Sequence, residues 1–246
     1  MEKHEIRYRL DLLIRLIDTT TGLTVTERDV QFRRDGRTVT PIPRGNGNFV
    51  FLNTGREDTT LEIRVYDYET VSVMIRYEEL DEFLPIQDVF LIPSENTARG
   101  EAILSLTGQL PDLMSIEAVR LGKPYCSVKS FDARKSIMTL FKTSGPDMEE
   151  IRYGLIHTEN MTFETFQVEK VISPVSLKLK NPLSEEFREN APITRVIYGQ
   201  IRADGSYFLR VRDDGSNVKY LVRYVAAGVP EYQVVDFHNP EALHRQ

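Results

Sequence analysis

Apolar and polar residues alternate with a period of two along much of the chain. From Ile6 to Leu16 every even position is apolar or aromatic, whereas the odd positions include three arginines and one aspartate. Successive side chains of a β-strand point to opposite faces, so this alternation predicts a long strand with one buried face. The same period recurs where Val71, Val73 and Ile75 alternate with their neighbours. Helical periodicity is almost absent, which favours an all-β fold.

Turn-forming residues separate the extended segments of the first part of the chain. In the stretch 44–65, Gly45–Asn48 precedes the apolar run Phe49–Leu52, and Leu61–Val65 follows after a second polar break. Glycine and asparagine tolerate the positive φ angles of a tight reversal, so the stretch predicts turn, strand, turn and strand. Also expected are strands at Val30–Phe32 and Val89–Ile92, a hairpin turn at Asp35-Gly36, and an irregular or briefly helical segment at Tyr77–Leu84. The first module is therefore predicted to be a β-sandwich.

The order of these segments resembles a known domain family. The segments that carry the resemblance are Leu16–Gly22 with Val25, Val30–Phe32, Gly47–Gly55 and Leu61–Tyr68. Their spacing and turn residues resemble the transthyretin-like, or carboxypeptidase regulatory-like, seven-stranded sandwich over roughly 11–93. The resemblance implies an accessory module, one that presents, spaces or stabilises another part of a larger protein or assembly.

A polar break near the middle of the sequence predicts two domains in tandem. Residues 94–100 are polar, small and charged, and Pro93 precedes them, so they are the expected linker between a domain at 1–93 and a second β-rich domain at 101–246. Strands and turns continue beyond the linker. A short helix is expected near Ser184, which would be its N-cap, with 185–187 in its first turn. The predicted fold is thus two tandem β-sandwich-like domains.

The C-terminal part predicts a three-stranded meander. Ile193–Arg202 is expected to pair with Ser206–Arg212 across Asp204-Gly205, and Ser206–Arg212 with Asn217–Val225 across a second glycine-containing turn. Sorting by parity assigns to the core side Val196, Tyr198, Tyr207, Leu209, Val211, Val218, Tyr220, Val222 and Tyr224. The opposite side is the candidate interaction face, made by Arg195, Phe208, Arg210, Arg212, Lys219 and Arg223. Such a face suits an acidic protein or an anionic glycan, although a solvated outer sheet face explains the pattern too.

Composition narrows the classes of partner. The 246 residues are 41% hydrophobic and 28% charged, which are ordinary globular values. A formal net charge of −6 and a pI near 5.4 argue against non-specific nucleic-acid binding, which depends on an excess of lysine and arginine. The single cysteine, Cys126, has no internal disulfide partner. The first residues have neither a signal-peptide pattern nor a membrane span, so folding in the cytoplasm is expected, even for a chain that later joins a particle.

Candidate chemistry is sparse. Cys126 lies between Tyr125 and Ser127 on a predicted strand with no protease signature, and the chain has no Gly-x-Ser-x-Gly elbow and no phosphate-binding glycine pattern. The acidic and histidine residues near the C-terminus match none of the usual zinc spacings; they are Asp236, His238, Glu241 and His244. We therefore expect no catalytic, cofactor or metal site, and a protein that is not an enzyme.

These features favour a structural or interaction protein. A transthyretin-like module, a second β domain, and the lack of disulfides and of an export signal together resemble the accessory proteins of phage tails and contractile phage-tail-like particles. The expected partners are other protein subunits of an assembly, and self-association is compatible with the sequence. Edge strands, notably the one near Ile6 to Leu16, are expected to add to a neighbour's sheet. The alternative function is a carbohydrate- or protein-ligand-binding module that uses loops at one end of a sandwich.

Overall fold

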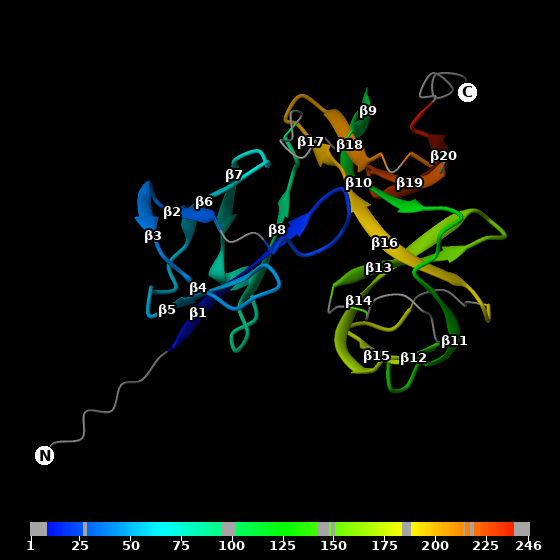
Figure 1. The fold of residues 1–246 in the computed structure, drawn as a ribbon, viewed down its shortest axis with the longest axis horizontal. Coiled ribbons are helices and arrows are strands. Elements are labelled where there is room, and N and C mark those ends of the chain that lie inside the picture. The colour runs from blue at the N-terminus through cyan, green and yellow to red at the C-terminus, as the bar shows by residue number, and fades with distance from the viewer. Residues whose placement is uncertain are drawn as a thin grey trace, which may run out of the picture. The chain divides into compact units, whose positions relative to one another are not determined.

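The protein is all-β, as its alternation predicts. The structure is a computed structural model that describes residues 9–26, 29–94, 102–141, 148, 151–183, 188–213, 215–216 and 219–238. These residues form twenty strands and one 3₁₀ helix, η1 (Tyr77–Glu79), which lies in the segment expected to be irregular (Figure 1). Within these ranges no helix has the length and apolarity needed to cross a membrane. The helix expected at 184–187 and most of the predicted linker lie outside the described residues.

The chain divides into two compact units. Unit 1 consists of 1–19 and 23–101, and unit 2 of 20–22 and 102–246. The strands of unit 1 are β1 (Leu10–Asp18), β2 (Val30–Arg34), β3 (Arg37–Val39), β4 (Ile42–Pro43), β5 (Asn48–Leu52), β6 (Thr59–Val65), β7 (Val71–Ile75) and β8 (Ile86–Leu91). They form two four-stranded sheets, with the orders β4-β5-β1-β8 and β3-β2-β6-β7. Both sheets contribute to one core, in which Ile14 from the first sheet and Phe32 and Ile63 from the second are almost fully buried.

Strand β1 is central, which corrects the prediction that it forms an open edge. It pairs with β5 in antiparallel fashion on one side and with β8 in parallel fashion on the other. Its cation at Arg15 is matched across the parallel pair by Asp88, with Nε–Oδ1 and Nη2–Oδ2 distances of 2.7 and 2.8 Å. A parallel partner some seventy residues along the chain leaves no local signal in the sequence, which explains the error.

A buried carboxylate holds the turn after β5 against the start of β1. Asp11 has no exposed side-chain surface, and its Oδ2 accepts hydrogen bonds from the backbone N–H groups of Thr54, at 2.5 Å, and Gly55, at 3.0 Å. Its Oδ1 accepts a third from Arg9 Nε, at 2.6 Å. Burial acts to raise the pKa of Asp11, but these hydrogen bonds and the charge of Arg9 hold it below its usual value of 3.8. The turn therefore depends on the ionised carboxylate.

Replacing Asp11 with asparagine is expected to lower the free energy of unfolding near pH 7 by about 1–2 kcal/mol, because one charged acceptor is lost from a buried network. The folded pKa lies below the unfolded one. The carboxylate's contribution is therefore complete above the unfolded pKa and is lost as the pH falls through the folded value. Urea denaturation near pH 7 and near pH 3 should then show the gap between wild type and Asp11→Asn shrinking at acid pH. The exposed Asp29→Asn variant is the control, and a gap that widens toward acid pH would contradict the assignment.

Unit 2 contains a closed six-stranded barrel. The strands are β9 (Ile103–Gln109), β10 (Leu113–Arg120), β11 (Cys126–Asp132), β12 (Ile137–Leu140), β13 (Arg152–His157), β14 (Thr162–Ser173), β15 (Ser176–Leu179), β16 (Pro192–Tyr198), β17 (Gln200–Ile201), β18 (Ser206–Arg212), β19 (Lys219–Ala226) and β20 (Val229–Asp236). A nine-stranded sheet runs β11-β12-β15-β14-β13-β16-β10-β19-β20, and an additional β11–β16 pairing closes its first six strands into a ring. Figure 1 shows these strands curving around one another. Tyr153, Met138 and Leu177 are almost fully buried in the core cluster that they share.

The predicted three-stranded meander does not form. Strands β16 and β19 both pair with β10, whereas β18 pairs with β17 and β9 in a separate three-stranded sheet. Only the hairpin across Asp204-Gly205 is present as expected. The two sheets share one core, in which β18 contributes Leu209 and β19 contributes Val222, both fully buried. The predicted core side of β18 and β19 is confirmed, but these strands meet through their side chains and are not hydrogen-bonded neighbours. For β16 the prediction is wrong, because Ile197 enters this core whereas Val196 packs in another cluster, and Val218 lies outside the described residues.

Candidate interaction surface

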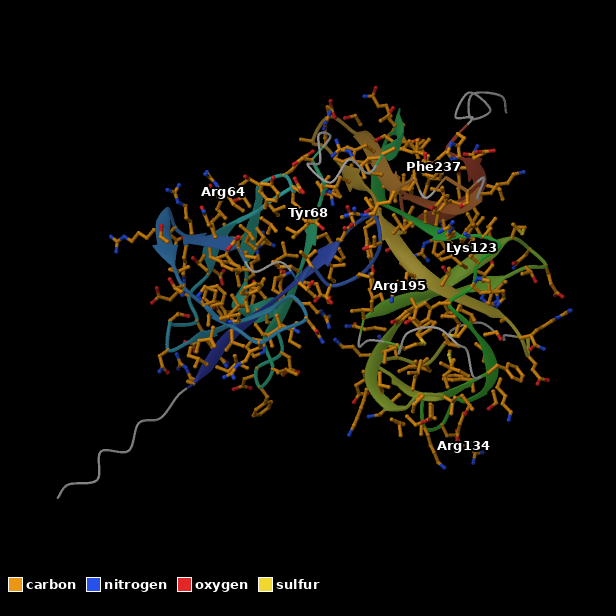
Figure 2. All side chains as sticks on the ribbon, in the orientation of Figure 1. Arg64, Tyr68, Lys123, Arg134, Arg195 and Phe237 are labelled. Carbon is orange, nitrogen blue, oxygen red and sulfur yellow. The ribbon has the colours of Figure 1, made fainter. Side chains whose placement is uncertain are left out.

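The structure does not bring the six residues of the candidate interaction face together. Phe208, Arg210 and Arg212 lie on β18, on the sheet face opposite its core residues. Lys219 and Arg223 belong to β19 of the other sheet. Arg195, which is labelled in Figure 2, belongs to β16. On β16, Arg195 has the parity of the core residues Ile193 and Ile197, and its guanidinium carbon lies 4.7 Å from the centroid of the Tyr125 ring.

The three β18 residues of the candidate face are engaged within the protein. The guanidinium carbons of Arg210 and Arg202 lie 4.9 and 5.3 Å from the centroid of the Phe208 ring, so both side chains make cation–π contacts with the same ring. Arg210 is only 7% exposed. Arg212 Nε donates a hydrogen bond of 3.1 Å to Thr20 Oγ1 within unit 2. These side chains therefore stabilise their own unit more than they offer an open cationic surface.

Arg223 belongs to a partly buried ion cluster. It pairs with Glu117, which lies opposite it on β10 and has a side chain only 9% exposed. Arg152 Nη1 lies 3.8 Å from the same carboxylate. Arg223 also reaches β14, where its guanidinium carbon lies 5.0 Å from the Phe163 ring centroid and its Nη2 lies 3.5 Å from Thr165 Oγ1. Since β14 and β19 are not neighbours in the sheet, the cluster joins distant parts of the same curved sheet.

Cys126 is buried among apolar side chains. It is 4% exposed, and its Sγ lies 3.6 Å from Met148 Sδ. Burial raises the pKa of the thiol to about 12, so the thiolate needed for nucleophilic attack is not favoured at neutral pH. The part of the chain that the structure describes contains no group of three metal-binding side chains, and His244 and Glu241 lie outside it.

The edges of the sheets differ in how well they are protected against pairing with another chain. Among the described residues the sheets have seven edge strands, and five of these are very short, charged or interrupted by proline. β17 has only two residues, and the others carry Arg37 (β3), Pro43 (β4), Asp88 (β8) or Pro230, Glu231 and Asp236 (β20). Natural proteins use these same devices to prevent unwanted pairing at exposed edges. The two other edges, β7 and β9, contain neither a charge nor a proline.

Strand β9 is the longer of these two unprotected edges. All seven of its residues pair with β18 without a register shift, and no other strand among the described residues pairs with its opposite side. Ser105 and Thr107 are exposed on one face, whereas Leu106 is 3% exposed in the core on the other. The sequence contains a sign of this open edge, because residues 102–111 carry no charge. The lack of charge becomes informative only once β9 is known to be an edge strand.

The edge glycine of β9 is covered by a cross-strand aromatic side chain. Gly108 lies opposite Tyr207 of β18, and a Cβ at Gly108 would come within 2.5 Å of the Tyr207 hydroxyl oxygen. The ring therefore occupies the space that a larger side chain would fill. This packing keeps β9 regular to its C-terminal end and preserves a continuous pairing edge.

Unit 1 contains a pocket of about 410 Å³ beside β2 and β3. Apolar groups from Phe32, Phe49 and Val39 line it together with polar side chains such as Arg33 and Arg64. Both arginines approach Glu62, with Nη1–Oε1 and Nε–Oε1 distances of 4.0 and 3.0 Å respectively. The mixture of apolar lining and convergent polar groups is typical of small-ligand sites.

Comparison with known proteins adds no family. No family model and no curated protein matches the chain. Among solved structures, extracellular domains 3–5 of Drosophila OTK align with 93% of this chain and 96% of that chain, at 9% sequence identity and a TM-score of 0.12. A likeness this low carries no information about the fold or function of the chain.

Proposed function

We propose that the protein is a non-enzymatic structural or interaction component of a larger macromolecular assembly, and that it joins its neighbours by strand addition. The observation that carries the proposal is the β9 edge, which is seven residues long, uncharged, free of proline and open on one side within the described residues. Backbone N–H and C=O groups on an open edge are ready to accept another strand. Strand addition satisfies them with main-chain hydrogen bonds, and side-chain contacts then select the partner.

The contrast between the edges supports this proposal. Most sheet edges in the described part of the chain carry a charge or a proline or are very short, which opposes unwanted pairing. An unprotected edge is costly to leave open, because it invites aggregation. Because the other edges are mostly protected and β9 is not, we infer that a partner strand covers β9 in the assembled state.

The proposed architecture is two tandem sandwich-like domains, the first transthyretin-like. Support comes from unit 1, where seven strands longer than two residues are divided between two sheets that share one core. In unit 2, the sheet β9-β18-β17 and the strands β10, β19 and β20 likewise share one core.

We further propose that the assembly is a phage tail or a contractile phage-tail-like particle, in which such modules serve as accessory parts. This step rests on analogy of fold.

The second candidate function is a ligand-binding module for a carbohydrate or a protein segment. The pocket beside β2 and β3 favours it, because apolar walls at Phe32 and Phe49 lie next to the polar groups of Arg33 and Glu62. A ligand that fills this pocket should raise the melting temperature of the protein by mass action.

The proposed function is tested by blocking the edge. The tagged full chain and its Ser105→Lys variant are purified from the native host and sized by gel filtration. Wild type should elute with a large particle, whereas the variant should elute as free chain, because lysine on an edge opposes pairing. Ser130→Lys is the matched control, since Ser130 is an exposed serine on β11. Elution of wild type as free chain, together with a glycan-induced rise in melting temperature, would favour the ligand-binding alternative.

A further inference from the structure

We propose that the strand added to β9 is β9 of a second copy of this chain, paired in antiparallel fashion about a two-fold axis at Leu106. This inference rests on the proposed function and names its partner. Two β9 strands joined in this way would create one continuous sheet from the two three-stranded sheets β17-β18-β9. An interface of this kind is isologous, because each copy contributes the same residues.

The register follows from the length of the strand and the parity of its side chains. Leu106 is the midpoint of Ile103–Gln109, so centring the pair there gives the largest number of paired residues. A slip by one residue would put the core side chains of one copy on the same face as the solvated side chains of the other. Such a slip is unfavourable, because apolar side chains would then be exposed to water. Centring on Ser105 or Thr107 keeps the faces but shortens the ladder.

Side chains in this register complement one another on both faces. On the core face, Leu106 would meet Leu106 of the partner subunit. Leu104 would meet Gly108 of the partner subunit, where Tyr207 already covers the glycine. On the outer face, exposed Ser105 would meet Thr107 of the partner subunit, and paired hydroxyls of this kind form hydrogen bonds across antiparallel strands. Leucine thus faces leucine or glycine on the core face, and serine faces threonine on the outer face, while Ile103 meets Gln109 at the two ends of the ladder.

Charge favours a second copy as the occupant of this edge. In a two-fold pair both strands carry the same residues, so a strand whose charges are all of one sign brings like charges together, which is destabilising. β20 illustrates the problem, since it contains Glu231 and Asp236 with no cation. β9 contains no charge at all, so self-pairing meets no such repulsion.

The dimer is expected to be weak. A single ladder of seven residues covers less area than the roughly 1,200–2,000 Å² that stable interfaces bury, so its dissociation constant should be micromolar or weaker. Sedimentation velocity over a range of concentrations should therefore show a reversible monomer–dimer equilibrium of the full chain.

Two double variants test both the edge and the register. Ser105→Lys/Thr107→Lys places lysines on both strands of the pair, and the association constant should fall by at least tenfold. Ser105→Lys/Thr107→Glu places lysine opposite glutamate at both ends of the two-fold pair and should restore dimerisation. Both variants change the same exposed positions, so any general cost of a long polar side chain is shared. Far-UV spectra and melting temperatures establish that each variant is folded.

Cross-linking provides a second test that does not depend on the lysine variants folding. In Ser105→Cys/Thr107→Cys, the cysteine at position 105 lies opposite the cysteine at position 107 of the partner subunit, so mild oxidation should give a covalent dimer. Ser105→Cys alone should not, because its sulfur would face Thr107 of the partner subunit. The native Cys126 is buried and contributes little background.

The outcomes separate this inference from the proposed function. A wild type that stays monomeric at all concentrations would overturn the inference. So would a dimer unaffected by the two lysines, or one that the lysine–glutamate variant fails to restore. If the wild type is monomeric but Ser105→Lys still detaches the chain from a large particle, the edge binds another subunit and the proposed function stands. If neither dimer nor particle depends on β9, both proposals fail.

Discussion

Replacing Glu117 with alanine should lower the free energy of unfolding by about 3–5 kcal/mol, one of the two largest effects expected for a single substitution in this chain. The carboxylate is almost buried and pairs with Arg223, whose side chain is only 18% exposed. Removing it leaves the guanidinium desolvated beside Phe163 with no compensating charge. Because Arg152 is 43% exposed, it can turn toward solvent and is not expected to limit the loss.

A double variant separates the cost of an unpaired charge from the value of the ion pair. Glu117→Ala/Arg223→Met removes both charges, so it should recover much of the stability lost in Glu117→Ala, since replacing a buried pair with apolar groups is often close to neutral. Glu169→Ala is the matched control, because Glu169 pairs with Lys178 at 2.8 Å while both side chains remain over 40% exposed. It should cost at most about 1 kcal/mol. Urea denaturation of the three variants measures these differences, and equal losses for Glu117→Ala and Glu169→Ala would contradict the buried cluster.

Local features of the sequence predicted the local features of the fold. Alternation between Leu10 and Leu16 gave a strand, and Asp204-Gly205 gave a hairpin, because each depends on residues close along the chain. Pairings between distant segments left no comparable signal. The parallel β1–β8 pair and the insertion of β10 between β16 and β19 are set by how whole sheets pack.

The candidate site shows the same division. The sequence indicated correctly that Phe208 and Arg210 share the side of β18 opposite its core residues. It could not indicate that Arg223 lies in a different sheet, because parity orders residues within a strand and does not identify the neighbouring strand. For the same reason the uncharged run in β9 acquired meaning only when the structure placed that strand at an edge.

The second large effect concerns a glycine that no other residue can replace without strain. Gly47 is buried in the turn before β5 with φ of +67°. Its carbonyl oxygen accepts a hydrogen bond from the backbone N–H of Leu16, at 3.0 Å. A Cβ at this position would lie 2.7 Å from the carbonyl oxygen of Val25 and 3.0 Å from that of Leu16. Both contacts involve backbone atoms, so a small side-chain movement cannot relieve them.

Gly47→Ala should therefore lower the free energy of unfolding by about 3 kcal/mol, the sum of the left-handed backbone penalty and the steric overlap. Gly45→Ala is a close control in the same turn. Gly45 has φ of +76° but no atom within 4 Å of its Cβ position, so only the backbone penalty of about 1 kcal/mol applies. Urea denaturation of the two variants isolates the steric part as their difference. Equal losses would mean that the turn moves to accommodate the methyl group, and that the close approach of Gly47 to Val25 and Leu16 does not determine the stability of unit 1.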